Sequence, residues 1–284
     1  MTKDDSLISR LPSGWCLTRL GKRVCLHPEA DEARIVAAAR RFLAGEGTSP
    51  GKGRGPTIRL EELGEALIFR PYRHGGMLRF LTGSRFLRPQ RFLEEARLTV
   101  EAGRRGVAVP APRGLLLERG PWGWKGVLIT TALEPIRDGT EIARGGGAVL
   151  SRAAAAGAEA VATLHAADIS HADLHLKNIL FSHDGGRAWI IDLDRARIKK
   201  SGRRTEVRRN LLRLLRSWVK LGETTDLPPG TPLRFLFRYC EKDPAATRSL
   251  AEELTRRYWR IRLSQLRWRM LSLFKGLGRG RRRK

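Results

Sequence analysis

Three polar side chains in the middle of the chain have the types and spacing needed to accept a proton and to bind a divalent cation. Asp173 lies in the segment HADLHLKNIL, Asn178 follows it by five residues, and Asp192 comes directly after the apolar run AWII. A carboxylate can take a proton from a hydroxyl group. Carboxylate and amide oxygens are also ligands that Mg²⁺ accepts. We therefore take these three residues as the candidate site.

Their order resembles the catalytic segment of kinase-fold phosphotransferases, in which His, Asp and Asn precede a strand that ends in Asp. That resemblance implies an ATP-dependent kinase with Asp173 as the catalytic base and Asn178 and Asp192 as ligands of Mg²⁺. The D-F-G tripeptide of protein kinases reads D-L-D here, so that Asp194 replaces the usual glycine. This departure keeps the metal ligand and argues against activation-loop switching of the protein-kinase sort.

Two other interpretations of the segment are open. His171, Asp173, His175 and His183 could bind a transition metal, because H-x-D-x-H can bring ligands together. That interpretation leaves Asn178 and Asp192 unexplained. The segment could also be an ordinary loop that contains charged residues, although such a loop does not account for the strand that ends in Asp192.

The segment GKGRGPT and the two strands expected after it have the pattern of a hairpin that covers phosphates. Gly53 and Gly55 are its candidate nucleotide-binding glycines, and a Walker A loop is excluded because Gly53 follows Lys52. The strand ALIFRPYRHGG has Arg70 where V-A-I-K of kinases supplies a lysine to the phosphates. We assign Arg70 to phosphate binding and Glu95, on a predicted helix at 89–105, as its partner. Arginine can bind phosphate bidentately but does not substitute freely for lysine.

The elements expected around these residues indicate an α+β, bilobed protein-kinase-like fold. It has a small antiparallel-sheet N-lobe and a mainly helical C-lobe, which contains the alanine-rich stretch SRAAAAGAEAVATLHAADI. The predicted divisions are an N-terminal extension of uncertain role, the N-lobe, the catalytic C-lobe and a basic C-terminal helix and tail, at 1–48, 49–133, 134–250 and 251–284.

Several segments together resemble the bacterial lipopolysaccharide core kinases, which phosphorylate Kdo or heptose. The segments are RPYRHGG, a basic loop with FLRP, EEARLTVEAGRRGVAVPAP, HADLHLKNIL, IIDLDRARI and RRNLLRLLRSWVK. The resemblance covers roughly residues 51–220. It implies transfer of the γ-phosphate of ATP to a hydroxyl of an inner-core sugar linked to lipid A, at the cytoplasmic face of the inner membrane.

The charge of the chain is consistent with an anionic partner. Its formal net charge is +26, and arginines 70, 73, 79, 85 and 88 lie around the glycine-containing loop before the predicted helix of Glu95. The lipid-linked core oligosaccharide would carry carboxylates and phosphates. The last 34 residues hold twelve Lys or Arg against two Glu, with Trp and Leu between them. This composition predicts peripheral contact with anionic membrane, although the helix could instead pack on the C-lobe with a basic tail beyond it.

The cysteines and the apolar segments of the sequence indicate the cellular compartment of the protein. Three cysteines without C-x-x-C spacing indicate neither a disulfide framework nor a zinc ribbon. The first residues lack the apolar core of a signal peptide, and no apolar run is long enough to span a bilayer. We therefore expect a cytoplasmic protein.

Two other functions are open. One is an atypical protein kinase or a small-molecule kinase of the aminoglycoside or choline type; His175 in D-L-H resembles the latter, but an antibiotic kinase usually has an acidic acceptor site. The other is a non-catalytic protein that binds nucleic acid on a kinase scaffold. The charge alone suggests it, and the presence of Asp173, Asn178 and Asp192 argues against it.

Overall fold

The computed structural model describes residues 7, 12–49, 57–73, 85–133, 136–199 and 203–260. The chain forms two compact units, which are described one after the other. The sheet unit consists of Met1–Ile136, Ala166–Ala172 and Trp189–Ile198. The helical unit consists of Arg137–His165, Asp173–Ala188 and Lys199–Lys284.

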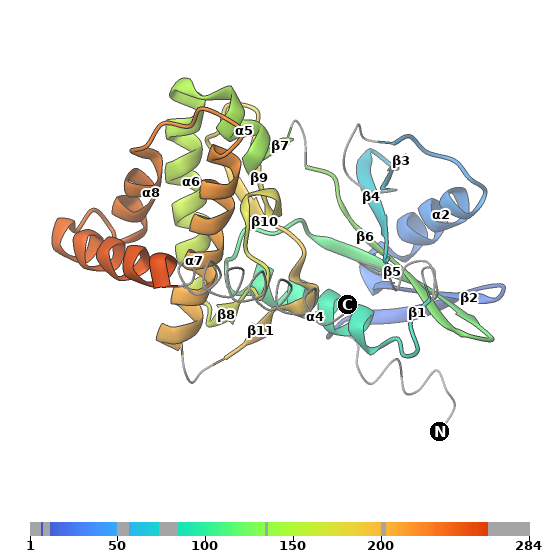
Figure 1. The fold of residues 1–284 in the computed structure, drawn as a ribbon. Coiled ribbons are helices and arrows are strands. Elements are labelled where there is room, and N and C mark those ends of the chain that lie inside the picture. Colours follow the sequence, from blue (N-terminus) through green and yellow to red (C-terminus); the bar gives the residue numbers. More distant parts are fainter. Residues whose placement is uncertain are drawn as a thin grey trace, which may run out of the picture. The chain divides into compact units, whose positions relative to one another are not determined.

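A six-stranded antiparallel sheet is the centre of the sheet unit (Figure 1). In the order in which they lie side by side, its strands are β1 (Trp15–Leu20), β2 (Arg23–Pro28), β5 (Pro112–Gly120), β6 (Gly123–Thr131), β4 (Glu65–Pro71) and β3 (Ile58–Glu62). The predicted extension at 1–48 thus contributes two strands to this sheet. After β2 a short 3₁₀ turn, η1 (Glu29–Asp31), leads into helix α2 (Glu32–Leu43).

Both faces of the sheet are covered, because side chains on a strand point alternately to its two faces. Leu115 and Leu117 of β5 belong to one apolar core, together with Phe92 of helix α4 (Gln90–Arg104). Leu116 belongs to a second core, together with Ile35 of α2. The three consecutive leucines of β5 therefore face two helices, one on each side of the sheet.

The predicted hairpin after the glycine-rich segment is confirmed. Strands β3 and β4 pair in antiparallel register from Ile58 opposite Phe69 to Glu62 opposite Glu65. The two residues between them, Leu63 and Gly64, both have positive φ, as a tight two-residue hairpin turn requires. The candidate glycines Gly53 and Gly55 lie outside the described residues.

The chain returns to the sheet unit twice after β6. Strand β8 (Ile169–Ser170) pairs with β11 (Arg197–Ile198). The second return begins at strand β10 (Ala188–Ile190). Its last residue, Ile190, donates its backbone amide to the Ala108 carbonyl at 2.8 Å. It is followed by a 3₁₀ turn, η3 (Leu193–Arg195), which places Asp192 and Asp194 in this unit.

The helical unit is built mainly from helices. They are α5 (Gly139–Gly145), α6 (Gly147–Ala166), α7 (Arg203–Gly222), α8 (Thr231–Tyr239) and a helix over 244–260. Strand β9 (Ile179–Ser182) pairs with β7 (Ile136–Asp138), and the 3₁₀ turn η2 (Leu176–Asn178) comes directly before β9. The alanine-rich stretch forms α6, as its composition predicts.

A buried polar group joins three of these helices. His165 of α6 is hydrogen-bonded through Nδ1 to the Tyr239 hydroxyl of α8 at 2.9 Å. Its Nε2 lies 3.1 Å from the side-chain nitrogen of Asn210, on α7. The histidine at the end of α6 therefore has a structural role, because it fixes α7 and α8 against α6. Among the described residues, no helix has the length and apolar character needed to cross a bilayer.

Candidate active site

The predicted base and one predicted metal ligand lie together in the helical unit. The Asp173 side chain is 60% exposed. Asn178 is buried, and its Nδ2 donates to the Asp173 backbone carbonyl at 2.9 Å. This bond fixes the loop between the two residues and uses the amide nitrogen of Asn178, so its amide oxygen points away from that carbonyl. The loop therefore presents an exposed carboxylate and a held amide oxygen.

Two neighbouring elements hold this loop in place. The Leu176 amide, at the start of η2, donates to Ser217 Oγ of α7 at 3.2 Å. From the other side, α5 comes so close that a Cβ on Gly139 would lie 2.6 Å from the Leu176 carbonyl oxygen. Asp138 caps α5 by accepting from the Glu141 amide, and the Glu141 carboxylate accepts from the Asp138 amide. Glycine is thus required at the start of α5 for this approach.

Among the described residues, the histidines of the segment form no cluster of metal ligands. His175 Nε2 lies 3.6 Å from Asp173 Oδ2, so it is a neighbour of the predicted base. His171 is buried in the sheet unit and its Nε2 is bonded to the Ile191 carbonyl at 2.9 Å. Among the described residues, no group of three or more His, Cys, Asp or Glu could hold a metal ion. The transition-metal interpretation thus has no ligand cluster in the described part of the chain.

In the sheet unit, Arg70 of β4 and Glu95 of α4 form an ion pair. Glu95 is almost completely buried, and the Arg70 guanidinium also lies 5.4 Å from the centre of the Tyr72 ring. Burial raises the pKa of Glu95, against the opposite effect of Arg70. Burial alone would lower the pKa of Arg70, but the Glu95 and Asp192 carboxylates raise it, so Arg70 stays charged. The structure thus brings together the two residues that the sequence paired.

Asp192 joins this pair. Its Oδ1 accepts from Arg70 Nη1 at 3.3 Å, and its side chain is 38% exposed. The backbone of Asp192 has φ 65° and ψ 58°, the left-handed conformation, directly before η3. For a residue other than glycine this conformation is strained. The strained turn directs the Asp192 carboxylate toward Arg70.

A second ion pair at the same turn was missed by the sequence reasoning. Arg91, in the first turn of α4, contacts the carboxylate of Asp194. Arg91 lies four residues before Glu95 and therefore on the same side of the helix. That spacing was the signal that could have found it.

Tyr72 lies beside the first ion pair. Burial raises the pKa of Tyr72, and the Glu95 carboxylate acts in the same direction.

The predicted basic group is only partly available for an anionic ligand. Arg73 and Arg88 are exposed. Arg85 lies 3.9 Å from Glu118, which also pairs with Arg23 at 2.8 Å. Arg79 lies outside the described residues.

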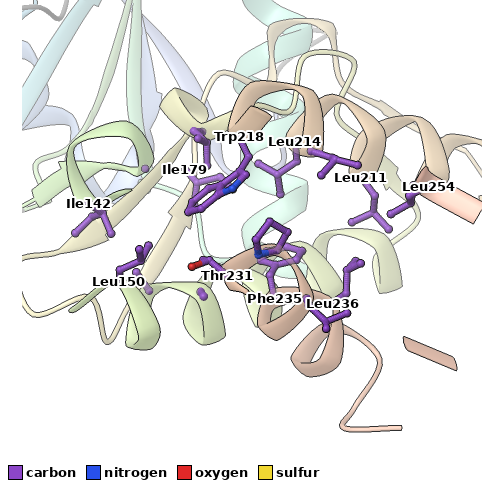
Figure 2. A pocket seen from close by; sticks show the side chains of 18 of the residues that line it. Ile142, Leu150, Ile179, Leu211, Leu214, Trp218, Thr231, Phe235, Leu236 and Leu254 are labelled. Carbon is purple, nitrogen blue, oxygen red and sulfur yellow. The ribbon is translucent and has the colours of Figure 1, made fainter. Parts of the chain in front are cut away.

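The helical unit also contains an apolar cavity of about 260 Å³. Figure 2 shows Leu150 of α6, Leu214 and Trp218 of α7 and Phe235 of α8 around it. Of its lining residues, Trp218, Thr231 and Thr255 carry polar side-chain atoms, and none is charged. An apolar lining of this kind suits an apolar ligand. No motif in the sequence indicates this cavity.

Known proteins resemble this chain in sequence. The family model described as the lipopolysaccharide kinase (Kdo/WaaP) family matches residues 45–239. A 3-deoxy-D-manno-octulosonic acid (Kdo) kinase of Xanthomonas axonopodis pv. citri (strain 306) is 35% identical over 160 residues, 54% of this chain and 62% of the relative. The protein of that name from Xylella fastidiosa (strain 9a5c) is 29% identical over 182 residues, 60% of this chain and 68% of the relative. The chain thus spans less than two thirds of the Xanthomonas relative.

A solved structure described as "WaaP in complex with acyl carrier protein" has a TM-score of 0.51 and 19% identity, and the match covers 82% of this chain and 97% of that chain. This likeness confirms the predicted α+β, kinase-like fold. Because the family model matches more than half of the sequence, the chain belongs to the lipopolysaccharide kinase (Kdo/WaaP) family.

Proposed function

We propose that the chain transfers the γ-phosphate of ATP to a hydroxyl of a Kdo residue in the inner core of lipopolysaccharide. The observation that carries the proposal is the exposed carboxylate of Asp173 on a loop fixed by the buried Asn178. Kdo is preferred to heptose because the curated relatives are named as Kdo kinases.

Asp173 would act on the acceptor hydroxyl. As the sugar oxygen attacks the γ-phosphorus, its proton passes to the Asp173 carboxylate, and the bond from the γ-phosphorus to the bridging oxygen breaks. ADP leaves with the electrons of that bond. His175, 3.6 Å from Asp173, would limit the positions that the Asp173 carboxylate can take.

Arg70 would bind the phosphates of ATP. Its guanidinium already contacts Glu95, which is buried, so its position is fixed before nucleotide binds. A planar guanidinium can bind two phosphate oxygens at once, which a lysine ammonium cannot do in the same way. Arg70 thus offers a held, permanently charged group in place of the lysine of other kinases.

Asn178 and Asp192 fit the requirements of Mg²⁺. Both offer oxygen atoms, and the amide nitrogen of Asn178 is engaged by the Asp173 carbonyl. Mg²⁺ is commonly held by one or two protein side chains together with substrate phosphates and water. The ion would neutralise the phosphate charges.

The test is transfer of labelled γ-phosphate, with Mg²⁺, to Kdo-lipid A, heptosylated core, a basic protein and an aminoglycoside. Asp173→Asn should lower kcat by on the order of 10² to 10⁴, the usual effect of losing a general base. The substitution should be tolerated because the side chain is exposed and Asn178 binds only the backbone carbonyl of Asp173. Asp226→Asn, at an exposed position of the same unit, is the matched control and should leave kcat unchanged.

The acceptor that takes the label decides between the alternatives. Label only in Kdo-lipid A, lost with Asp173→Asn, supports the proposal. Label only in heptosylated core would move the acceptor to heptose, and label in the basic protein or the drug would favour the protein or small-molecule kinases. If no acceptor is labelled and the chain binds RNA or DNA, the nucleic-acid alternative is favoured.

We also propose that the apolar cavity binds an aliphatic chain. Its lining has no charged group, and its volume of about 260 Å³ is larger than that of an apolar cavity of ~150 Å³ that binds benzene. In the solved structure described above, WaaP is in complex with acyl carrier protein. For this chain, an acyl group presented by an acyl carrier protein is therefore the candidate occupant.

The matched variants for this second proposal lie next to each other on α6. Ala154 lines the cavity, whereas Ala155 does not. Ala154→Phe should fill the cavity and abolish binding of acylated carrier protein, and Ala155→Phe should leave binding unchanged. Unacylated carrier protein should not bind either variant or the parent. Equal binding of the acylated and unacylated forms would show that the cavity takes no acyl chain.

A further inference from the structure

The turn that follows β10 is held by two separate arginines. Arg70 of β4 contacts Asp192, and Arg91 of α4 contacts Asp194. Between the two carboxylates, the Leu193 side chain is buried at 2% exposure. The turn is therefore attached to the sheet on one side and to the helix on the other.

Arg91 is itself held in place. Its guanidinium lies 5.1 Å from the centre of the Phe86 ring, and Phe86 is buried against Phe92 at 5.0 Å between ring centres. The backbone of Phe86 is bonded to that of Trp124 in both directions, at 2.8 and 2.6 Å. Asp194, the partner of Arg91, has a side chain that is only 12% exposed. Both members of the pair thus have few alternative positions.

The charges explain why the pair is needed. Three carboxylates, those of Glu95, Asp192 and Asp194, lie around two guanidiniums, those of Arg70 and Arg91. Without Arg91, Asp194 would be a largely buried carboxylate close to two others of the same sign. Such a charge is costly unless it is paired. Loss of Arg91 should therefore displace the turn, and Asp192 with it.

We propose that Arg91 and Asp194 are positioning residues that clamp helix α4 to the turn and so keep the Asp192 carboxylate in one position. This inference rests on the proposed function, in which Asp192 binds Mg²⁺. Arg91 and Glu95 are one helical turn apart, so the clamp and the Glu95–Arg70–Asp192 contacts fix the same helix face to the same turn. In D-F-G kinases, the position of Asp194 is a glycine, which imposes no such constraint.

The test is a double-mutant cycle of Arg91→Met and Asp194→Asn, with Arg97→Met as the control. Arg97 is exposed on the same helix and loses the same charge. Each single variant should raise the Mg²⁺ concentration needed for half-maximal transfer about tenfold, and the double variant should be no worse than either single one. Arg97→Met should need the same Mg²⁺ concentration as the parent.

A second measurement does not depend on activity. The Ala196 amide donates to the Leu193 carbonyl at 3.0 Å, so its hydrogen exchange reports opening of the turn. Exchange at Ala196 should be about tenfold faster in Arg91→Met and Asp194→Asn than in the parent and in Arg97→Met. Unchanged exchange in both variants would overturn the clamp.

The two readouts separate the possible failures. Faster exchange with an unchanged Mg²⁺ requirement would show a purely structural pair and would overturn the positioning role. If the parent does not phosphorylate Kdo-lipid A, the proposed acceptor is wrong. The clamp is then decided by the Mg²⁺-dependent affinity for a non-hydrolysable ATP analogue, measured by titration calorimetry, which should fall about tenfold in the variants but not in Arg97→Met.

Discussion

Burial acts against the ionisation of Glu95, although its carboxylate contacts the guanidinium of Arg70. The pKa of Glu95 in the folded chain lies above its ordinary value of 4.5, with burial as the main cause. Between these two pKa values the folded state binds the proton and the unfolded state does not. The free energy of unfolding should therefore fall as pH rises from about 4.5 through the folded-state pKa.

Glu95→Gln should remove this contribution of Glu95 to the pH dependence of the free energy of unfolding, because glutamine does not titrate. The measurement is urea unfolding of the parent and of Glu95→Gln over a series of pH values, with the two free energies subtracted. The difference, parent minus variant, should decrease as pH rises through this range. A difference that increases instead would mean that the attraction of Arg70 outweighs burial and depresses the pKa of Glu95.

Gly139 provides a second prediction at the scale of single residues. In Gly139→Ala the new Cβ would lie 2.6 Å from the Leu176 carbonyl oxygen, a backbone atom that cannot move without displacing η2. We expect kcat to fall at least about tenfold and the free energy of unfolding to fall by about 1–3 kcal/mol, as for other overpacked sites.

Gly145→Ala is the matched control in the same helix. Its new Cβ would meet Arg137 Nη1 at 3.7 Å, an ordinary contact. Activity should be kept, and stability should rise by up to about 1 kcal/mol because alanine favours the helix. Equal loss of activity in both variants would mean that α5 tolerates no added side chain, whatever its contacts with η2.

At the scale of elements, a network of four charged side chains attaches the start of α2 to the sheet. Glu65 of β4 accepts from Arg34 at 2.7 Å and from Arg113 of β5 at 2.8 Å. Asp31, just before α2, completes the network at 3.2 Å from Arg113. The Glu65 side chain is 16% exposed, so solvent weakens these pairs less than it weakens surface pairs.

Glu65→Gln should therefore lower the free energy of unfolding by about 1–2 kcal/mol, since two charge-assisted bonds become weaker. Glu61→Gln removes a carboxylate of the neighbouring strand that is 73% exposed and pairs with Arg59 at 2.9 Å. That loss should be below about 0.5 kcal/mol. Urea unfolding measures both, and equal losses would show that the network does not stabilise α2 on the sheet.

The elements that sequence reasoning found are those with a strong local signal. The alanines of α6 favour helix by themselves, and the hairpin of β3 and β4 is marked by its turn at Leu63 and Gly64. Strand β1 was missed because its sequence, WCLTRL, lacks regular alternation of polar and apolar residues and is stabilised by its pairing with β2. A strand of this kind is specified by its neighbour rather than by its own residues.

The candidate site, like the fold, was predictable where its residues have a local sequence pattern. The types and spacing of Asp173, Asn178 and Asp192 identified the candidate site, and the contact of Arg70 with Glu95 was expected from the position of the kinase lysine. The Arg91–Asp194 pair joins residues 103 positions apart, so the spacing of Arg91 and Glu95 does not identify Asp194 as the partner. The cavity is formed by several elements and has no local pattern. Such contacts follow from the fold.

At the scale of the whole molecule, basic residues outnumber acidic ones, with 55 Lys or Arg against 29 Asp or Glu and a net charge of +26. Nine Lys or Arg follow residue 260, where the described part of the chain ends. Within the described part, Leu254 is buried and Glu253 pairs with Arg208 of α7 at 2.5 Å, so this segment is attached to α7 near residues 253 and 254. Trp259, near the end of this part, is 56% exposed.

We expect the chain to bind vesicles that contain anionic lipid, and a variant that ends at residue 260 to bind them at least about tenfold more weakly. Each cation near the surface of an anionic membrane contributes on the order of 1 kcal/mol. Co-sedimentation with phosphatidylglycerol and phosphatidylcholine vesicles measures the effect. Binding of the full chain should be confined to the anionic vesicles and should weaken as salt rises, because salt screens these charges.

If the shortened and full chains bind equally, the basic segment is not the membrane contact. If RNA displaces the full chain from the vesicles at low concentration, the segment is a general polyanion-binding surface rather than one suited to lipid.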